Sequence, residues 1–258
     1  MRHEFTLRFR GSAVVLAGLA AGLSTVCAAQ PGRRLESPPS RSLVTIIRVK
    51  PEMINEWLDL QKNSVVPELK KAAVKTRTVY ASGIFGNAFE YTIIQPMIKF
   101  AEFDSPETQA AALGSVADAG MAERLRKCVV STSSFLRTAL PALSDNFTET
   151  KNPPMVGFLR LRVAPGKMEE YETLFKSEVL PALKKVNSGI MAASRRLGTD
   201  GYDLTFETPM TKFADLDAPP PLVLAAGPEG AARLAAKFNG IATVVENTVL
   251  IRQADLSF

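Results

Sequence analysis

The chain contains the same sequence pattern twice, and this repeat constrains its fold more than any single motif. The stretch Pro51–Lys71 (PEMINEWLDLQKNSVVPELKK) matches Pro165–Lys185 (PGKMEEYETLFKSEVLPALKK), 114 residues further along. A second block, Thr92–Asp104 (TIIQPMIKFAEFD), matches Thr205–Asp217 (TFETPMTKFADLD), 113 residues further along. Self-similarity at a fixed distance indicates a structural unit that is repeated. We therefore expect two copies of one domain, each long enough at about 100 residues for its own hydrophobic core.

The first 29 residues have the features of a secretory signal peptide. A start that carries Arg2, Arg8 and Arg10 precedes an apolar, small-residue run at 13–26, and two alanines follow at the expected cleavage site. The segment is short and rich in glycine and alanine for a membrane span. Lipidation of Cys27 is the weaker alternative, because Val26 stands where a small residue is expected. We expect an exported protein, periplasmic or secreted, with no membrane span after cleavage.

Removal of this segment takes away the residues that most often carry chemistry. The chain has a single histidine, His3, and two cysteines, of which only Cys128 would remain. No internal disulfide, Cys/His zinc site or His-based catalytic pair can then form. The net charge of the full chain is +5, without a long run of basic residues, so nucleic acid is not an expected partner. We expect no metal site and no cofactor.

The repeats predict the domain organisation. We expect a signal peptide at 1–29, a flexible segment at 30–42, one repeat at 43–143, a linker at 144–154 and a second repeat at 155–258. Each repeat shows the order strand, helix, strand, strand, helical region, strand, which is the ferredoxin-like βαββαβ unit. One face of such a four-stranded sheet is bare, and the second copy can cover it.

Proline and glycine mark the irregular points of the expected helices. The first helix of each repeat starts at Pro51 or Pro165, where the missing N–H costs nothing. Pro67 and Pro181 lie late in these helices and are expected to kink them, since each removes an i→i−4 hydrogen bond. The stretch 227–230 (GPEG) lacks the Lys-Ser/Thr ending of a phosphate loop and is interpreted as a turn that opens a helix.

The second repeat carries a resemblance to a known superfamily. The stretch 159–185 (LRLRVAPGKMEEYETLFKSEVLPALKK), followed by a glycine-containing hairpin and FADLD, resembles the dimeric α+β barrel proteins. The NIPSNAP and antibiotic-biosynthesis-monooxygenase branches look nearest. The resemblance implies tandem ferredoxin-like βαββαβ repeats that form an intramolecular eight-stranded α+β barrel. Haem-binding members commonly use a histidine ligand, which the mature chain would lack.

One candidate site lies on the charged face of the sheets. Strand alternation places Arg48 and Arg162 opposite the apolar, helix-facing side chains. As paired planar donors, these two arginines could bind a carboxylate. The alternative is a set of structural ion pairs, because the same face carries Arg137, Arg160, Arg252, Glu90, Asp203, Glu207 and Glu246. The near balance of charges favours ion pairs, since buried charges are tolerated when they are paired.

A second candidate site is the apolar space between each sheet and its helices, where the monooxygenase branch places small aromatic substrates. Trp57 and Tyr171 occupy equivalent helix positions, and Tyr91 and Tyr202 are expected on the helix-facing side of the third strands. Aromatic walls with polar tips suit a small-molecule cavity. The commoner explanation is that such residues belong to the core. Tyr80 joins Trp57 and Tyr91 as a residue to mutate if the protein is an enzyme.

Three functions remain open. The leading hypothesis is that the protein binds a small organic molecule, aromatic or anionic. The first alternative is a cofactor-independent monooxygenase that acts on a quinol or phenolic substrate, since such a substrate can itself reduce oxygen. The second alternative is a structural or interaction module, which would expose a large apolar patch. Further oligomerisation through an exposed edge strand stays possible.

Overall fold

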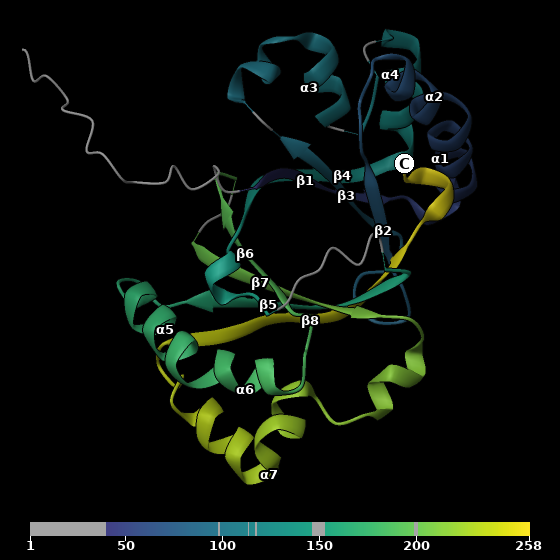
Figure 1. Ribbon diagram of the computed structural model, residues 1–258. Coiled ribbons are helices and arrows are strands. Elements are labelled where there is room, and N and C mark those ends of the chain that lie inside the picture. Colours follow the sequence, from purple (N-terminus) through teal and green to yellow (C-terminus); the bar gives the residue numbers. More distant parts are fainter. Residues whose placement is uncertain (1–39, 98, 113, 117, 146–152, 199–200) are drawn as a thin grey trace, which may run out of the picture. The chain divides into compact units, whose positions relative to one another are not determined.

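A computed structural model describes residues 40–97, 99–112, 114–116, 118–145, 153–198 and 201–258 (Figure 1). The expected signal peptide, and most of the expected N-terminal segment and linker, lie outside these residues. The strands are β1 (Arg41–Val49), β2 (Thr78–Ser82), β3 (Glu90–Met97), β4 (Val129–Ala139), β5 (Met155–Val163), β6 (Met191–Arg196), β7 (Tyr202–Met210) and β8 (Ala242–Arg252).

The eight strands form a closed barrel in the order β1-β3-β2-β8-β5-β7-β6-β4. Every neighbouring pair is antiparallel. The order within β1–β4 is 4-1-3-2, and β5–β8 repeat it as 8-5-7-6, so the barrel consists of two ferredoxin-like halves. The predicted eight-stranded α+β barrel is confirmed.

Two short strand pairings join the halves and close the ring. Strand β2 pairs with β8 from Tyr80↔Arg252 to Ser82↔Leu250. Strand β4 pairs with β6 from Leu136↔Arg196 to Ala139↔Ala193. In a single half, the outer edges of β2 and β4 would be unpaired. The two pairings cover part of these edges, so less of each edge is left to pair with another chain.

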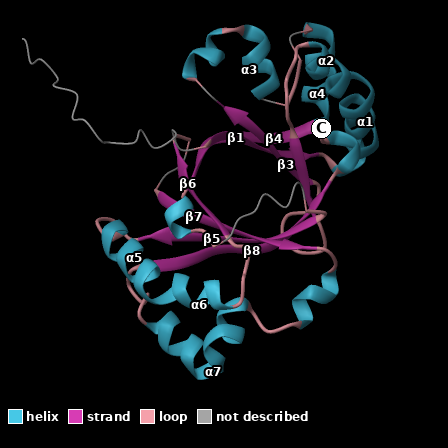
Figure 2. Cartoon of the chain, viewed as in Figure 1, coloured by secondary structure: helices cyan, strands magenta, loops and turns pink. Residues whose placement is uncertain are grey.

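Helices cover the outside of the barrel in two groups, one for each half (Figure 2). The first half carries α1 (Ile54–Leu60), α2 (Val66–Lys71), α3 (Pro106–Ala112) and α4 (Ala119–Cys128), and the second carries α5 (Met168–Leu174), α6 (Leu180–Lys185) and α7 (Pro221–Ala236). Each group packs on the apolar face of its sheet and builds its own core, around Trp57 in the first half and Tyr171 in the second. None of the described helices is long and apolar enough to cross a membrane.

The expected proline kinks take the form of wider helical turns. A π-helical turn, η2 (Gln61–Val65), separates α1 from α2, and Pro67 lies in the first turn of α2. The second half repeats this with η5 (Phe175–Val179) ahead of Pro181. Proline cannot donate the i→i−4 hydrogen bond, and a widened turn absorbs the change.

The expected turn at 227–230 is present inside α7. Gly227 has non-helical dihedral angles, φ 70° and ψ 167°, and the helix resumes at Pro228. A positive φ favours glycine, and proline suits the first turn of a helix.

Candidate functional site

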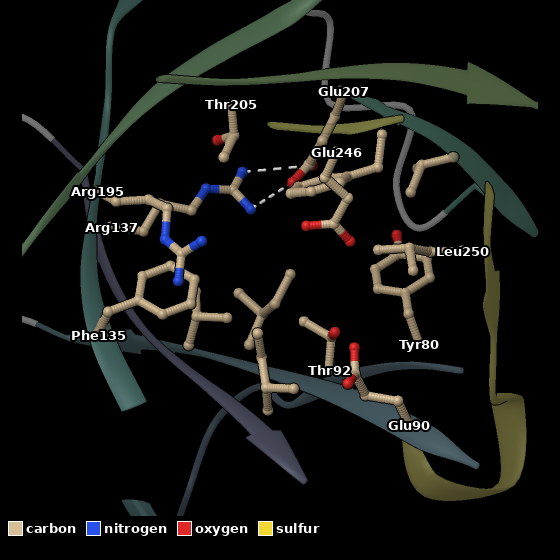
Figure 3. Close-up of a pocket in the computed structure, with 15 residues that line it drawn as sticks. Tyr80, Glu90, Thr92, Phe135, Arg137, Arg195, Thr205, Glu207, Glu246 and Leu250 are labelled. Atoms are coloured by element: carbon tan, nitrogen blue, oxygen red, sulfur yellow. Dashed lines mark hydrogen bonds and ion pairs between the residues drawn. The ribbon is translucent and has the colours of Figure 1, made fainter. Parts of the chain in front are cut away.

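The inner face of the barrel encloses a cavity to which all eight strands contribute (Figure 3). Its apolar lining consists of Val44, Ile46, Ile94, Phe135, Val156, Phe158 and Leu250. Its polar lining consists of Tyr80, Glu90, Thr92, Arg137, Arg195, Thr205, Glu207 and Glu246. The cavity volume is about 30 Å³, room for roughly two water molecules. Small-molecule sites combine apolar walls with convergent polar groups, and this cavity has both, with the polar residues slightly more numerous.

An ion pair in this cavity ties the two halves together. Arg137 on β4 donates from Nη1 to Glu207 Oε1 (2.6 Å) and from Nη2 to Glu207 Oε2 (3.3 Å). Both side chains are nearly buried, at 11% and 12% exposed. Such bidentate pairs are strong and geometrically specific. Arg137 and Glu207 therefore act together as a neutral, fixed part of the wall (Figure 3).

A second cluster of charges surrounds Asp203 at the start of β7. Arg160 Nη1 lies 2.9 Å from Asp203 Oδ2, and Arg162 Nε lies 2.9 Å from Asp203 Oδ1. Arg160 Nε also donates to Glu246 Oε2 at 3.2 Å. Although burial raises the pKa of the Asp203 carboxyl, the hydrogen bonds from Arg162 and Arg160 outweigh it and hold this pKa below its ordinary value. Asp203 is therefore the charged centre of the second half at neutral pH.

Arg195 on β6 adds a third cation to this region. Its Nη1 lies 4.0 Å from Asp203 Oδ2. Its guanidinium carbon lies 3.6 Å from the centroid of the Phe135 ring, in a cation–π contact. Since β6 belongs to the second half and β4 to the first, this contact also bridges the closing seam.

Glu90 occupies the position in the first half that Asp203 occupies in the second. Glu90 pairs with Arg48 in the β1–β3 register, as Asp203 pairs with Arg162 between β5 and β7. Glu90 accepts a hydrogen bond from Asn87 Nδ2 (3.2 Å), and within the described part of the chain it forms no ion pair. Burial raises the pKa of the Glu90 carboxyl, and the charge of Glu246 adds to this, whereas Asn87 and Arg48 act in the opposite direction. Glu90 therefore takes up a proton more readily than an ordinary glutamate.

Tyr80 and Thr92 adjoin Glu90 on the cavity wall. Tyr80 on β2 stands directly opposite Thr92 on β3, two residues along from Glu90 on the same face. Burial raises the pKa of the Tyr80 hydroxyl to about 12, and Glu207 contributes, while Arg252 and Arg137 lower it. The hydroxyl is thus a hydrogen-bond donor at neutral pH. Figure 3 shows Tyr80, Thr92 and Glu90 along one side of the cavity, with Glu246 pointing into it.

The structure separates the two arginines that were predicted to bind an anion together. Arg48 and Arg162 end equivalent strands, β1 and β5, which stand on opposite sides of the ring. Arg48 is exposed at the barrel end. Arg162 is bound to Asp203, which fits the predicted ion pairs. The two guanidiniums therefore do not form one joint site.

The predicted aromatic residues divide between core, surface and cavity. Trp57 is fully buried, with its ring centroid 4.3 Å from that of Tyr91, and both belong to the first helix-facing core. Tyr171 packs against Phe175 in the second. Tyr202 is 62% exposed. Of the predicted site residues, Tyr80 is the one that lines the cavity.

Sequence reasoning did not select the other polar cavity residues as a site. Glu90, Thr92, Thr205 and Glu207 follow the strand alternation that placed them on the charged face, and that alternation was the usable signal. Arg195 carried no such signal, because its role depends on the β4–β6 seam. Within the described ranges, no group of three or more His, Cys, Asp or Glu side chains is placed to hold a metal ion.

Comparison with known proteins supports the fold. No family model matches the chain, and no curated protein matches it in sequence. A mutant chlorite dismutase from Candidatus Nitrospira defluvii superposes with a TM-score of 0.54 at 12% identity, over 86% of this chain and 94% of that one. An anthrone oxidase-like protein gives 0.53 at 10% identity, over 83% and 92%. A candidate monooxygenase from Lactobacillus acidophilus NCFM gives 0.50 at 10% identity, over 85% and 95%. The chain shares the α+β barrel fold of these proteins.

Proposed function

We propose that this protein binds a small organic molecule inside the barrel. The observation that carries the proposal is the wall formed by β2 and β3, where Tyr80, Thr92 and Glu90 adjoin one another and form no ion pair among the described residues. On the opposite wall Glu207 is held by Arg137, and Asp203, further along the same strand, is held by Arg160 and Arg162. One side of the cavity thus keeps its hydrogen-bonding groups available for a ligand.

The groups on this wall favour a hydroxyl-bearing aromatic ligand over an anionic one. Tyr80 can donate a hydrogen bond, Thr92 can donate or accept, and ionised Glu90 accepts. The charges of Glu90 and Glu246 together disfavour a negatively charged ligand at this wall. Val44, Ile46 and Ile94 offer apolar surface next to the polar groups. A small phenol matches this combination of groups. Because the cavity has room for roughly two water molecules, the side chains around it must move to admit a phenol.

Native mass spectrometry of the mature chain, purified from its natural source, tests the proposal. We expect an extra small mass that is lost under activation, and saturable binding of phenols in calorimetry. Tyr80→Phe should weaken binding about tenfold, since it removes one hydrogen bond of roughly 1.4 kcal/mol. Glu90→Gln should also weaken binding, because it replaces a charged acceptor by a neutral one. Glu229→Gln, at an exposed glutamate of α7, is the matched control and should bind as the wild type does. A bare chain that binds no compound of a phenol panel would contradict the proposal.

An oxygenase reaction on a phenol or quinol is the second candidate, and the character of Glu90 favours it. A carboxylate with a raised pKa in a partly dry cavity is suited to accept the proton of a phenolic hydroxyl. The resulting phenolate is the electron donor for oxygen. The candidate monooxygenase and the anthrone oxidase-like protein share this fold, which is compatible with such chemistry. Oxygen uptake with hydroquinones that disappears in Glu90→Gln is the expected result, and uptake no faster than with heat-killed protein would exclude the reaction.

The exported location is also a proposal. It rests on the basic start and the apolar run of residues 1–29. N-terminal sequencing of the protein from cell fractions is the test, and we expect a mature start close to Gln30 in the periplasmic or secreted fraction. We also propose a relation to the NIPSNAP branch, which rests on the sequence of residues 159–185 and the hairpin and FADLD stretch that follow. A role as an interaction module stays a prediction, to be tested by partner pull-down.

A further inference from the structure

Strand β8 ends, at its seam with β2, on an arginine that has no ion-pair partner. Arg252 is partly buried, and its Nε is buried without a hydrogen bond among the described residues. Alternation places its side chain on the same face of β8 as Leu250 and Glu246, which line the barrel cavity. Val249 and Ile251 lie on the other face, in a hydrophobic cluster. Among the residues that the structure places, the Arg252 guanidinium forms no ion pair.

Arg252 stands directly opposite Tyr80 in the β2–β8 register. Opposite residues of antiparallel strands have their Cβ atoms about 5 Å apart on the same face. Burial and the charge of Glu207 raise the pKa of the Tyr80 hydroxyl, and the charges of Arg252 and Arg137 act against them. The charge of Arg252 thus reaches this hydroxyl group. Two hydrogen-bond donors, a phenolic hydroxyl and a guanidinium, adjoin each other at the seam.

The other seam of the barrel shows that closure does not require this pair. Thr92 and Thr205 match in the sequence repeat, and they lie opposite Tyr80 and Ala193, respectively. Across the β4–β6 seam, Ala193 stands opposite Ala139. The tyrosine–arginine pair therefore takes the place of two alanines. It is a property of the β2–β8 seam and not of the fold.

Position 94 explains why Arg252 has no acid nearby. Ile94 matches Glu207 in the sequence repeat, and both residues line the cavity. Glu207 is bound to Arg137 through two hydrogen bonds. Ile94 packs against an apolar cluster that includes Tyr80 and carries no charge. A partly buried cation without an acid is costly, and a carboxylate on a ligand compensates it.

The cavity extends to the neighbours of Arg252. Tyr80, opposite it on β2, and Leu250, two residues before it on the same face of β8, both line the cavity. Side chains must move to admit a ring of phenol size, because the cavity has room for roughly two water molecules. Movement of these two neighbours opens the cavity toward the guanidinium.

We propose that Arg252 and Tyr80 bind the carboxylate of a hydroxyaromatic acid held in the barrel cavity. This inference rests on the function proposed above and names a second polar group of that ligand. A guanidinium offers a carboxylate a planar pair of donors. Glu90 and Glu246 are both displaced from the Tyr80–Arg252 pair in the same direction along the strands, and Glu246 is about 20 Å away along β8. The hydroxyl group of the ligand therefore faces Thr92 and Glu90, and its carboxylate faces the seam.

Calorimetric titration of the full mature chain with 4-hydroxybenzoate, 4-hydroxybenzamide and phenol tests this inference. The amide has the shape of the acid without its charge. We expect the wild type to bind the acid about tenfold more tightly than the amide, because hydrogen bonds to a charged group are the stronger ones. Arg252→Met should bind the acid and the amide equally. Arg233→Met, at an exposed arginine of α7, is the matched control and should keep the preference.

Two variants at position 94 give a second readout in the same titrations. Ile94→Glu supplies the acid that the second half has at this position, and should pair with Arg252 and so remove the preference for the acid. Ile94→Gln has the same size without the charge, and should keep the ratio of the two affinities.

The outcomes separate this inference from the function on which it rests. A wild type that binds phenol but shows no preference for the acid would overturn the carboxylate site and leave the phenol site intact. A preference that persists in Arg252→Met, or that Arg233→Met loses equally, would overturn the carboxylate site as well. Failure to bind any of the three compounds would instead contradict the proposed function, and the carboxylate site with it.

Discussion

The two halves of the barrel place an arginine and an acid at the same register positions, yet only one half closes them into a cluster. Arg162 and Asp203 in the second half meet Arg160 and Arg195 as well. In the first half, Arg48 and Glu90 have Ile46 and Ser82 at those additional positions. The two halves thus share one backbone arrangement. The residues at two positions, Arg160 and Arg195 or Ile46 and Ser82, decide whether the acid is surrounded by arginines.

The cores between the sheets and the helices also differ between the halves, and again the first half is the more polar. The first half buries Gln61 and Arg77 where the second half has Phe175 and Ile190. Both differences leave polar groups of the first half without an ion-pair partner among the residues placed by the structure. We infer that the second half stabilises the barrel and that the first half carries the sites. This predicts one barrel ligand per chain in a calorimetric titration, and two equal sites would contradict it.

Removal of the acid from each half gives the largest expected contrast. Asp203→Asn leaves several arginines without their shared carboxylate, and should lower the free energy of unfolding by about 3–5 kcal/mol. Glu90→Gln removes no ion pair and should change it by about 0.5 kcal/mol or less. Urea unfolding of the two variants measures both values. Equal losses would show that the halves do not differ in this way.

The pH dependence of stability should have opposite signs for the two acids. The pKa of Asp203 is lowered in the folded state, so its stabilisation is present above the unfolded value near 3.9 and is lost as pH falls through the folded value. The pKa of Glu90 is raised, so its proton-linked stabilisation is present below the unfolded value near 4.3 and is lost as pH rises through the folded value.

Unfolding free energies measured from about pH 3 to pH 7 isolate these two contributions, when the wild type is compared with Asp203→Asn and with Glu90→Gln. We expect the Asp203 difference to grow with pH and the Glu90 difference to shrink with it. Two curves with the same slope would show that the two carboxylates share one environment.

Removal of the equivalent arginines, Arg162 and Arg48, should give the smallest difference in the free energy of unfolding. Arg162→Met removes two hydrogen bonds to buried Asp203 and should cost about 1 kcal/mol. Arg48→Met acts at an exposed position, where charge interactions contribute roughly 0–1 kcal/mol, and should be close to neutral. Chemical denaturation of both variants resolves the difference. A larger cost at Arg48 would reveal a pairing with Glu90 that stabilises the first half.

Particular residues show how far sequence reasoning reached toward the site. Alternation along β3 correctly placed Tyr91 toward the helices and Glu90 away from them. The same reasoning could not separate a ligand-binding aromatic residue from a core one, because Trp57 and Tyr80 carry similar local signals. It also selected Arg48 and Arg162 as one site, since equivalent positions in a repeat carry no information about the distance across the barrel.

The sequence by itself determined the repeat, the order of strands and helices, and the face on which each strand carries its charges. These properties follow from local periodicity and from self-similarity, which require no knowledge of distant contacts. Only the tertiary structure decided that Arg195 reaches the Asp203 cluster, that Arg137 pairs with Glu207 across the halves, and that Glu90 forms no ion pair with any residue that the structure describes. The physical reason is that ion pairing depends on which strands become neighbours when the barrel closes. The β2–β8 and β4–β6 seams join segments more than 50 residues apart in the chain.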